Sequence, residues 1–244
     1  MMVLVSPNLP AWPTAAALAG YTTIILTGVM TPQLGMFAPV LCRTKSGRAE
    51  IALTFDDGPS PGSTPKVLAE LARHDARATF FVLGEKVEQH PEILQAIHAA
   101  GHEIGLHGQQ HDRLLSIRHP RRIASQLAQV QSLVQSVTGC TPHLFRPPVG
   151  HVSPRTAVAA RRLGLTLVGW SVRGRDGLRR ATAAAVATRV KRGLAPGSIV
   201  LLHDASEREQ FEPAGVAALS EILAETSRRG LACVTLTEAL STST

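Results

Sequence analysis

Short β-rich runs alternate with amphipathic helical stretches from about Glu50 to the C-terminus, and this alternation constrains the fold more than any other feature. Runs of this kind, bounded by turn residues, predict strands. The predicted strands are Ile51–Phe55, Thr79–Val82, Glu103–Leu106, His143–Phe145, Leu165–Trp170, Ile199–Leu202 and Leu231–Leu236. Strands separated by helices indicate a parallel α/β architecture, closed or nearly closed as a barrel.

Three helical stretches have the clearest apolar periodicity. The stretch that begins at Pro120 repeats apolar residues at spacings of four and three and ends at Gly139, which is typical of a helix C-cap. Two further helices are predicted from Pro91 to Gly101 and from Pro213 to Gly230. Because no linker or repeat interrupts this region, we expect a single domain here.

The N-terminal segment, residues 1–42, carries no charged side chain, and residues 15–41 are mostly apolar. That length is enough to cross a bilayer. A cleaved signal peptide would begin with a basic stretch, which is absent, so the sequence favours a retained membrane anchor. Pro32 and the glycine and proline after it would kink or end a helix near Met30, and a buried or disordered leader remains the alternative.

The net charge of +7, from 25 Lys and Arg against 18 Asp and Glu, indicates an anionic partner. Aromatic residues are only 4% and no nucleic-acid-reading motif is found, so we expect no nucleic acid and favour an anionic membrane surface. Arg43, Lys45 and Arg48 follow the apolar segment and nothing basic precedes it, so the positive-inside rule favours a cytoplasmic C-terminal domain. A periplasmic or extracellular location stays open.

Polar residues able to do chemistry follow the carboxyl ends of the predicted strands. They are Asp56, Asp57, His107, His111, Arg146, Asp176 and His203. In a parallel barrel these strand ends form one face, and active sites are built on that face. Residues far apart in sequence are therefore predicted to meet in one site.

The adjacent carboxylates of Asp56 and Asp57 end the first predicted strand, before a turn at Gly58-Pro59. Neighbours on an extended strand point opposite ways, so one could face a metal and the other a substrate water. The alternative is a loop pair that caps the helix starting near Ser63.

His107 and His111 are separated by three residues, which on a helical turn would place both imidazoles on one side. With one carboxylate they make a His-His-Asp set, which leaves positions open for water and substrate. This is the arrangement of a catalytic zinc site.

At these residues the sequence resembles a known family. The run Thr54-Phe55-Asp56-Asp57-Gly58-Pro59 is similar to the first motif of the polysaccharide deacetylases with the NodB homology domain, carbohydrate esterase family 4. The similarity continues in order through Gly101–Gly105 with His107 and His111, Arg146–Gly150, Trp170–Asp176 and Leu201–Asp204. It covers residues 48–240 and implies a distorted (β/α)7-type barrel as the catalytic domain.

The resemblance implies a role for each matching residue. Asp57, His107 and His111 would bind one divalent ion, Zn²⁺ or else Co²⁺ or another divalent ion. Asp56 would act as general base, because such an ion brings the pKa of its water towards neutrality. Arg146 would pair with this base and fix its orientation.

On the other side of the substrate, His203 is similar to the family's general acid, which protonates the departing amine. Asp176 is matched to the carboxylate that pairs with this histidine. The backbone N–H of Val149 would hold the oxyanion, and Leu201 would shape the pocket for the acyl methyl. The full set expected to bind substrate is Pro148, Val149, Gly150, Leu201, Arg173 and Arg175.

Several positions depart from the family pattern. Leu106 and Gly108 stand where Asn and Ser or Thr are common, which alters the surroundings of His107. Arg173 replaces an Asp, and Gly177, like Val149, removes an aromatic wall from the groove in which relatives stack sugars. Guanidinium groups at Arg173, Arg175, Arg179 and Arg180 could instead hold a phosphate, or form a solvated basic loop.

Two enzymatic functions follow. The first is metal-dependent removal of an N-acetyl group from an amino sugar, in polysaccharide or lipid-linked form, by a domain associated with a membrane through residues 15–41. The second is deformylation or deacylation of a lipid-phosphate-linked amino sugar. A non-catalytic glycan-binding member of the family is the contrasting interpretation.

Overall fold

The structure, a computed structural model, describes residues 12–44, 47–208 and 210–241. Its strands are β1 (Glu50–Asp56), β2 (Ala78–Leu83), β3 (Glu103–Gly108), β4 (Leu144–Phe145), β5 (Thr166–Leu167), β6 (Val172–Arg173), β7 (Ile199–His203) and β8 (Ala232–Cys233). Its helices are α1 (Trp12–Met30), α2 (Thr64–Arg73), α3 (Gly84–Gln89), α4 (Pro91–Ala99), α5 (Pro120–Thr138), α6 (Pro154–Arg162), α7 (Ala183–Gly193), α8 (Ala214–Arg228) and α9 (Leu236–Leu240).

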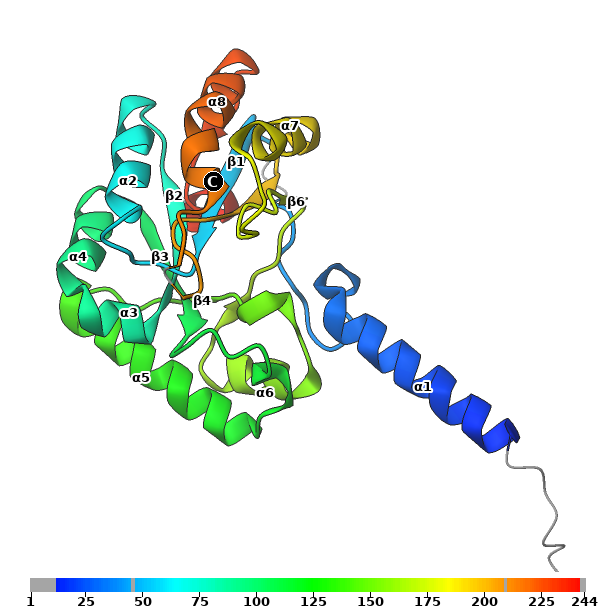
Figure 1. Ribbon diagram of the computed structural model, residues 1–244. Coiled ribbons are helices and arrows are strands. Elements are labelled where there is room, and N and C mark those ends of the chain that lie inside the picture. Colours follow the sequence, from blue (N-terminus) through cyan, green and yellow to red (C-terminus); the bar gives the residue numbers. More distant parts are fainter. Residues whose placement is uncertain (1–11, 45–46, 209, 242–244) are drawn as a thin grey trace, which may run out of the picture.

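The strands form a parallel sheet in the order β5-β4-β3-β2-β1-β7-β6, and β8 pairs with β1. Helices surround it on the outside (Figure 1). The central strands β1 and β2 are buried along nearly their whole length, as expected for a sheet covered on both faces. The predicted distorted (β/α)7-type barrel is confirmed, and it brings the carboxyl ends of β1, β3 and β7 to one edge.

The central elements agree with the sequence prediction. The helices expected after Pro91, Pro120 and Pro213 are all present. Helix α5 is followed by Gly139, whose φ of 77° is the left-handed conformation that the predicted C-cap requires.

The strands at the ends of the sheet differ from the prediction. Of the expected strand Leu165–Trp170 only β5 is assigned as a strand, and Val168 continues it as an isolated parallel bridge to Leu41. The next carbonyl, that of Gly169, accepts from the Arg146 guanidinium. Of Leu231–Leu236 only β8 is a strand, because a capping box of Thr235 and Glu238 starts α9. Strand β6 was not predicted.

The segment of residues 41–44 is built into the barrel. Leu41 donates its N–H to the Leu167 carbonyl (2.8 Å) and accepts from the Gly169 N–H (2.9 Å). Thr44 donates to the Gly197 carbonyl (2.9 Å) just before β7. The boundary expected at residue 42 therefore falls inside a segment that joins β5 to β7.

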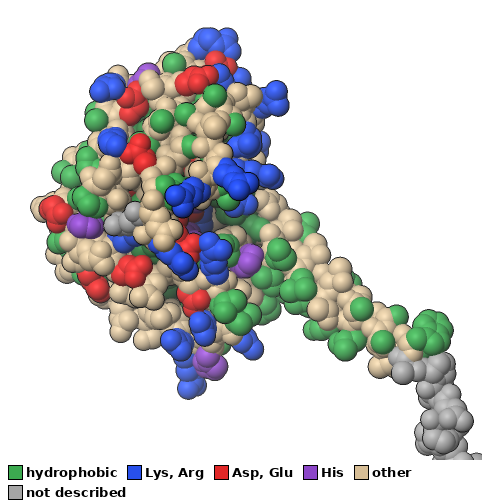
Figure 2. Space-filling model, viewed as in Figure 1, with side chains coloured by type: hydrophobic (Ala, Val, Ile, Leu, Met, Phe, Trp, Pro, Cys, Tyr) green, Lys and Arg blue, Asp and Glu red, His purple; other side chains and the backbone are tan. Residues whose placement is uncertain are grey.

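Helix α1 projects away from the barrel (Figure 1) and presents apolar side chains along its length (Figure 2). Gly28 is its one buried residue. Its length and composition are sufficient to cross a membrane, and it ends at Met30, where the sequence predicted a helix break. Residues 1–11 of the predicted leader and Lys45 of the basic flank lie outside the described residues.

Candidate metal centre and active site

The two adjacent aspartates both face one pocket. Asp56 is the last residue of β1, whereas Asp57 has a φ of 75° and has already left the extended conformation. The expectation that neighbouring side chains point opposite ways is therefore wrong here: the His107 Nε2 lies 4.0 Å from Asp56 Oδ2 and 3.4 Å from Asp57 Oδ1. The N-cap residue of α2 is Ser63, so neither aspartate caps that helix.

The two histidines meet without a helical turn, which corrects the sequence prediction. His107 lies in β3, and His111 lies in the loop after it. Gly108, with a φ of 119°, turns the chain between them, so that the two ring centroids are 5.4 Å apart. The His111 Nε2 lies 3.7 Å from the Asp57 Oδ1, the same oxygen that His107 approaches.

The chemistry of these donors fits a divalent ion. One ligand atom from each of Asp57, His107 and His111 lies within 4.8 Å of the others. The Asp57 Oδ1 is buried and has no hydrogen-bond partner among the described residues, so a positive group is needed there.

The tautomer of His107 also suits a metal ligand. Its Nδ1 lies 2.7 Å from the Arg146 carbonyl, which can only accept, so Nδ1 carries the proton and Nε2 keeps its lone pair. Burial lowers the pKa of His107, which favours this neutral form.

The carboxylate of Asp56 is held by a buried guanidinium. Arg146 donates from Nη1 to Asp56 Oδ1 (2.7 Å) and to Thr54 Oγ1 (2.8 Å), and from Nη2 to the Gly169 carbonyl (2.8 Å). Its carbon Cζ lies 4.2 Å from the centre of the Phe81 ring. Burial raises the pKa of Asp56, but Arg146 and the nearby histidines outweigh burial and hold the pKa below its usual value. Asp56 is therefore an anion that can accept a proton.

His203 is paired with Asp176 by two hydrogen bonds. The Asp176 Oδ1 lies 2.9 Å from the His203 Nδ1, and its Oδ2 accepts the His203 backbone N–H at 2.8 Å. Burial lowers the pKa of His203, but the Asp176 carboxylate, with Asp57 and Asp56 farther away, outweighs it and raises the pKa to about 9. The imidazole is therefore a cation with a proton to donate at neutral pH.

These groups line one open pocket with a volume of about 760 Å³. Of the residues expected to bind substrate, Val149, Gly150, Leu201, Arg173 and Arg175 line it. Pro148 is buried and is not part of the lining. Arg179 and Arg180 do not line it either, so the predicted arginine cluster is divided.

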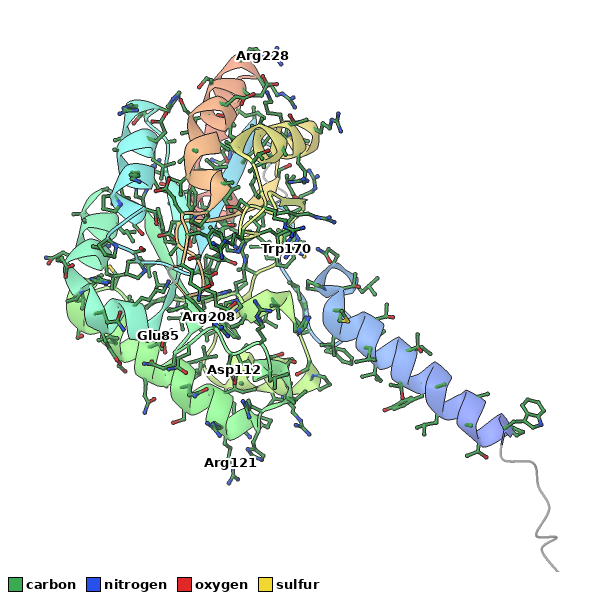
Figure 3. The ribbon with its side chains drawn as sticks, viewed as in Figure 1. Glu85, Asp112, Arg121, Trp170, Arg208 and Arg228 are labelled. Carbon is green, nitrogen blue, oxygen red and sulfur yellow. The ribbon has the colours of Figure 1, made fainter. Side chains whose placement is uncertain are left out.

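Sequence reasoning missed several residues of the pocket wall. Trp170, named above only as part of a motif, and Phe211 provide aromatic surface at positions other than 149 and 177, and the Arg173 guanidinium lies over the Trp170 ring, 5.5 Å from its centre. Arg208 adds positive charge, and Figure 3 labels it and Trp170 near the centre of the view. Figure 2 shows basic side chains gathered around this part of the surface. The loop that carries Arg208 and Phe211 follows the carboxyl end of β7, and this place in the sequence could have indicated that the loop borders the site.

A further missed group lies beside His111. The Glu207 Oε1 is 3.5 Å from the His111 Nδ1, and the Glu207 Oε2 accepts from the Arg113 Nη2 at 2.6 Å. The His111 Nδ1 has no hydrogen-bond partner among the described residues, so Glu207 is a nearby negative charge beside this ring and not a bonded partner.

Fold and site together define a class of protein, a parallel α/β barrel with a candidate Asp-His-His metal site at the carboxyl edge of its strands. Residues 43–168 match the family model described as polysaccharide deacetylase, and the chain belongs to this family.

Two curated relatives illustrate the similarity. The peptidoglycan-N-acetylglucosamine deacetylase PgdA of Listeria monocytogenes is 36% identical over 200 residues, which are 82% of this chain and 40% of the relative. The chain thus spans less than half the length of that protein. A chitooligosaccharide deacetylase of Bradyrhizobium is 34% identical over 198 residues, which are 76% of this chain and 88% of the relative.

Solved structures share the fold. The Bc1960 peptidoglycan N-acetylglucosamine deacetylase superposes with a TM-score of 0.75 at 32% identity, covering 83% of this chain and 92% of its own. A family 4 acetyl xylan esterase from Clostridium thermocellum, solved with a cobalt ion, superposes with a TM-score of 0.71 at 33% identity. The match covers 78% of this chain and 89% of the esterase chain.

Proposed function

We propose that this protein hydrolyses the N-acetyl amide of an amino sugar in a glycan, releasing acetate and a free amine. One observation carries the proposal: a buried carboxylate, Asp56, and an aspartate-paired imidazole, His203, line the same pocket as an Asp-His-His ligand set. Relatives named as deacetylases of peptidoglycan and of chitooligosaccharides support this substrate class.

Each group has one task in the reaction. A divalent ion held by Asp57, His107 and His111 would supply Lewis acidity for the amide carbonyl and the attacking water. Asp56 accepts the proton of that water, and Arg146 keeps Asp56 ionised and in place. His203 donates its proton to the nitrogen as the C–N bond breaks, and Asp176 holds its ring.

The turn at Val149 completes the pocket. Val149 has a φ of 54°, an uncommon conformation for a β-branched residue, and it lines the pocket. We assign its backbone N–H to the developing oxyanion, as the family resemblance implies, and Leu201 to the wall beside the acyl methyl. An amide donor does not depend on the side chain, so valine suffices in place of an aromatic residue.

Zn²⁺ is the ion we propose, with Co²⁺ as a functional substitute, because two imidazoles and one carboxylate suit either ion. The sugar itself would pack on Trp170 and Phe211, and Arg173 and Arg175 would contact anionic groups of the substrate. These arginines are the one feature that favours the second function, removal of a formyl or other acyl group from a lipid-phosphate-linked amino sugar.

The deciding experiment measures acetate and formate released from N-acetyl chitooligosaccharides, peptidoglycan and N-acylated amino sugars on a lipid phosphate. The chain is first treated with a chelator and then supplied with Zn²⁺ or Co²⁺. Activity should require the metal, and Asp56→Asn should lower it by at least about 10²-fold. The exposed Asp75→Asn variant is the matched control.

Retention of wild-type turnover by Asp56→Asn would contradict the mechanism. A folded, metal-loaded chain that binds sugars but releases no acid from any of these substrates would identify the non-catalytic glycan-binding alternative.

The membrane association of α1 and the cytoplasmic orientation expected from the basic flank are also proposals. A reporter fused to the C-terminus tests the orientation, because its activity differs between the two sides of the membrane. Reporter activity outside the cytoplasm would overturn the expected sidedness without affecting the chemistry.

A further inference from the structure

The carboxyl end of α1 is bonded to the wall of the pocket. The Val29 carbonyl accepts the Val152 N–H at 3.1 Å, two residues after the pocket residue Gly150. The Gln33 Nε2 donates to the carbonyl of Trp170 at 3.3 Å, and Trp170 itself lines the pocket. The helix thus ends within a few residues of the site.

The chain that follows α1 provides no flexible stalk. Gly28 packs so closely on Met36 that an added Cβ would lie 2.3 Å from its sulfur, so the chain folds back on the helix end. Leu41 and Thr44 are then bonded into the barrel. Both ends of residues 29–44 are fixed to the domain, and the direction of α1 is fixed with them.

The surface of α1 suits hydrocarbon better than water. Its nineteen residues include no charged side chain, and at about 1.5 Å per residue they span roughly 28 Å, close to the thickness of a bilayer core. The hydroxyls of Thr22 and Thr23 donate to the carbonyls of Leu18 and Ala19, both at 2.8 Å, so these polar groups are satisfied inside the helix. Trp12 stands at the far end, as aromatic anchors do.

From these contacts we propose that α1 spans a lipid bilayer and holds the pocket directly at the membrane surface. Gln33 would then lie at the interface, and Trp170 with it. This inference rests on the proposed deacetylase function. A pocket held at the membrane surface would reach glycan carried at that surface, but it would not reach more distant glycan that only a domain on a flexible stalk could contact.

The geometry is tested by lipid quenching of tryptophan fluorescence. The chain contains two tryptophans, Trp12 and Trp170, so Trp12→Phe leaves Trp170 as the single indole. The full-length variant is reconstituted in vesicles whose lipids carry bromine near the headgroup. Trp170 fluorescence should fall clearly below its value in unbrominated vesicles.

A matched control places the single indole far from α1. Arg228 lies at the end of α8, on the side of the molecule away from α1 (Figure 3). The variant Trp12→Phe, Trp170→Phe, Arg228→Trp should show no quenching. Absence of quenching at Trp170 would overturn the proposal, and it is the result expected if α1 is removed by cleavage or is covered by a second copy of the chain.

The substrate pool is tested with a spacer variant. Twenty Gly and Ser residues inserted between Met30 and Thr31 give a reach of about 25 Å and leave Gln33 with the domain. In proteoliposomes, the wild-type chain should deacetylate vesicle-tethered N-acetyl chitooligosaccharide about tenfold or more faster than insoluble peptidoglycan, because tethering raises the local concentration. The spacer variant should gain activity on the insoluble polymer.

Free chitooligosaccharide separates this inference from the proposed function. Wild type and spacer variant should hydrolyse it at equal rates. If neither hydrolyses it, the deacetylase function fails, while the quenching result still decides the position of the pocket. If both act equally on free and insoluble substrates, the restriction to the membrane surface is wrong.

Discussion

Asp56 and His203 are register partners on the neighbouring parallel strands β1 and β7, and each is the last residue of its strand. The proposed base and acid are thus positioned by two directly paired strands of the sheet and not by loops. Their partners, Arg146 and Asp176, are fully buried and reach them from two other strand ends. The distance between base and acid is therefore a property of the sheet.

The pairing of His203 with Asp176 predicts an alkaline limit to activity. Since the pKa of His203 is raised to about 9, its proton is present below that pH and is lost above it, and the rate should fall as pH rises through about 9. The same pair contributes to the stability of the fold. Its contribution is complete at pH values below the unfolded pKa of about 6.5, and it is lost as pH rises through the folded pKa of about 9.

Removal of the carboxylate tests this explanation. In Asp176→Asn the alkaline limit of kcat/KM should move towards about pH 6.5. A pH profile that keeps its alkaline limit near 9 in this variant would show that another group is responsible. Asp75→Asn, exposed and distant from the site, should leave the profile unchanged.

The buried Arg146 predicts a large loss of stability on substitution. Arg146→Met removes the cation but leaves the Asp56 carboxylate buried, and breaking such a pair costs about 3–5 kcal/mol. Urea unfolding followed by circular dichroism measures the difference. The double variant Asp56→Asn, Arg146→Met should recover part of the loss, because the unpaired charge is gone. Equal losses in the single and double variants would contradict an electrostatic cause.

A glycine behind the site provides a test of close packing. A Cβ at Gly215, in α8, would lie 2.2 Å from the Asp176 Oδ2, so Gly215→Ala should displace the carboxylate from His203. We expect a lower kcat together with a lower alkaline limit. Gly62→Ala is the matched control, because its Cβ would meet only the Ser60 hydroxyl at 4.0 Å. A wild-type pH profile in Gly215→Ala would refute the displacement.

Much of the site was predictable because its residues follow strand ends. The alternation of strands and helices alone predicts that Asp56, His107 and His203 lie on one face. The pairing of Asp176 with His203 could be expected only from the family resemblance, because the intervening loop has no regular pattern. The structure supplies the two hydrogen bonds that join them.

The remaining features depend on backbone conformations and long-range contacts that local patterns do not encode. The spacing of His107 and His111 suggested a helical turn, but Gly108 turns the chain in another way. Periodicity likewise could not show that Leu41 would bond beside β5, since that contact joins segments more than a hundred residues apart. The pocket wall at Phe211 belongs to a loop and has no periodic signal.

The buried carboxyl of Asp204 predicts an unusual pH dependence of stability. Burial raises the pKa of Asp204 to about 7, although Thr64 and Lys86 oppose the rise. Between the unfolded pKa of about 3.9 and this value, the folded chain retains a proton that the unfolded chain loses. This group therefore stabilises the fold most at acidic pH, and its contribution falls by up to about 1.4 kcal/mol per pH unit as pH rises towards 7.

The variant Asp204→Asn tests this dependence, because asparagine is neutral at every pH and keeps the shape of the side chain. Its amide oxygen can still accept the hydrogen bond from the Thr64 hydroxyl. The free energy of unfolding of this variant should change less with pH than that of wild type, and above pH 7 the variant should be the more stable protein. Urea unfolding at a series of pH values between 4 and 8 measures the slope directly. Parallel profiles for the two proteins would mean that Asp204 is ionised in the folded chain. The buried Lys86 would then be the group that balances its charge, and Lys86→Met should destabilise wild type more than Asp204→Asn.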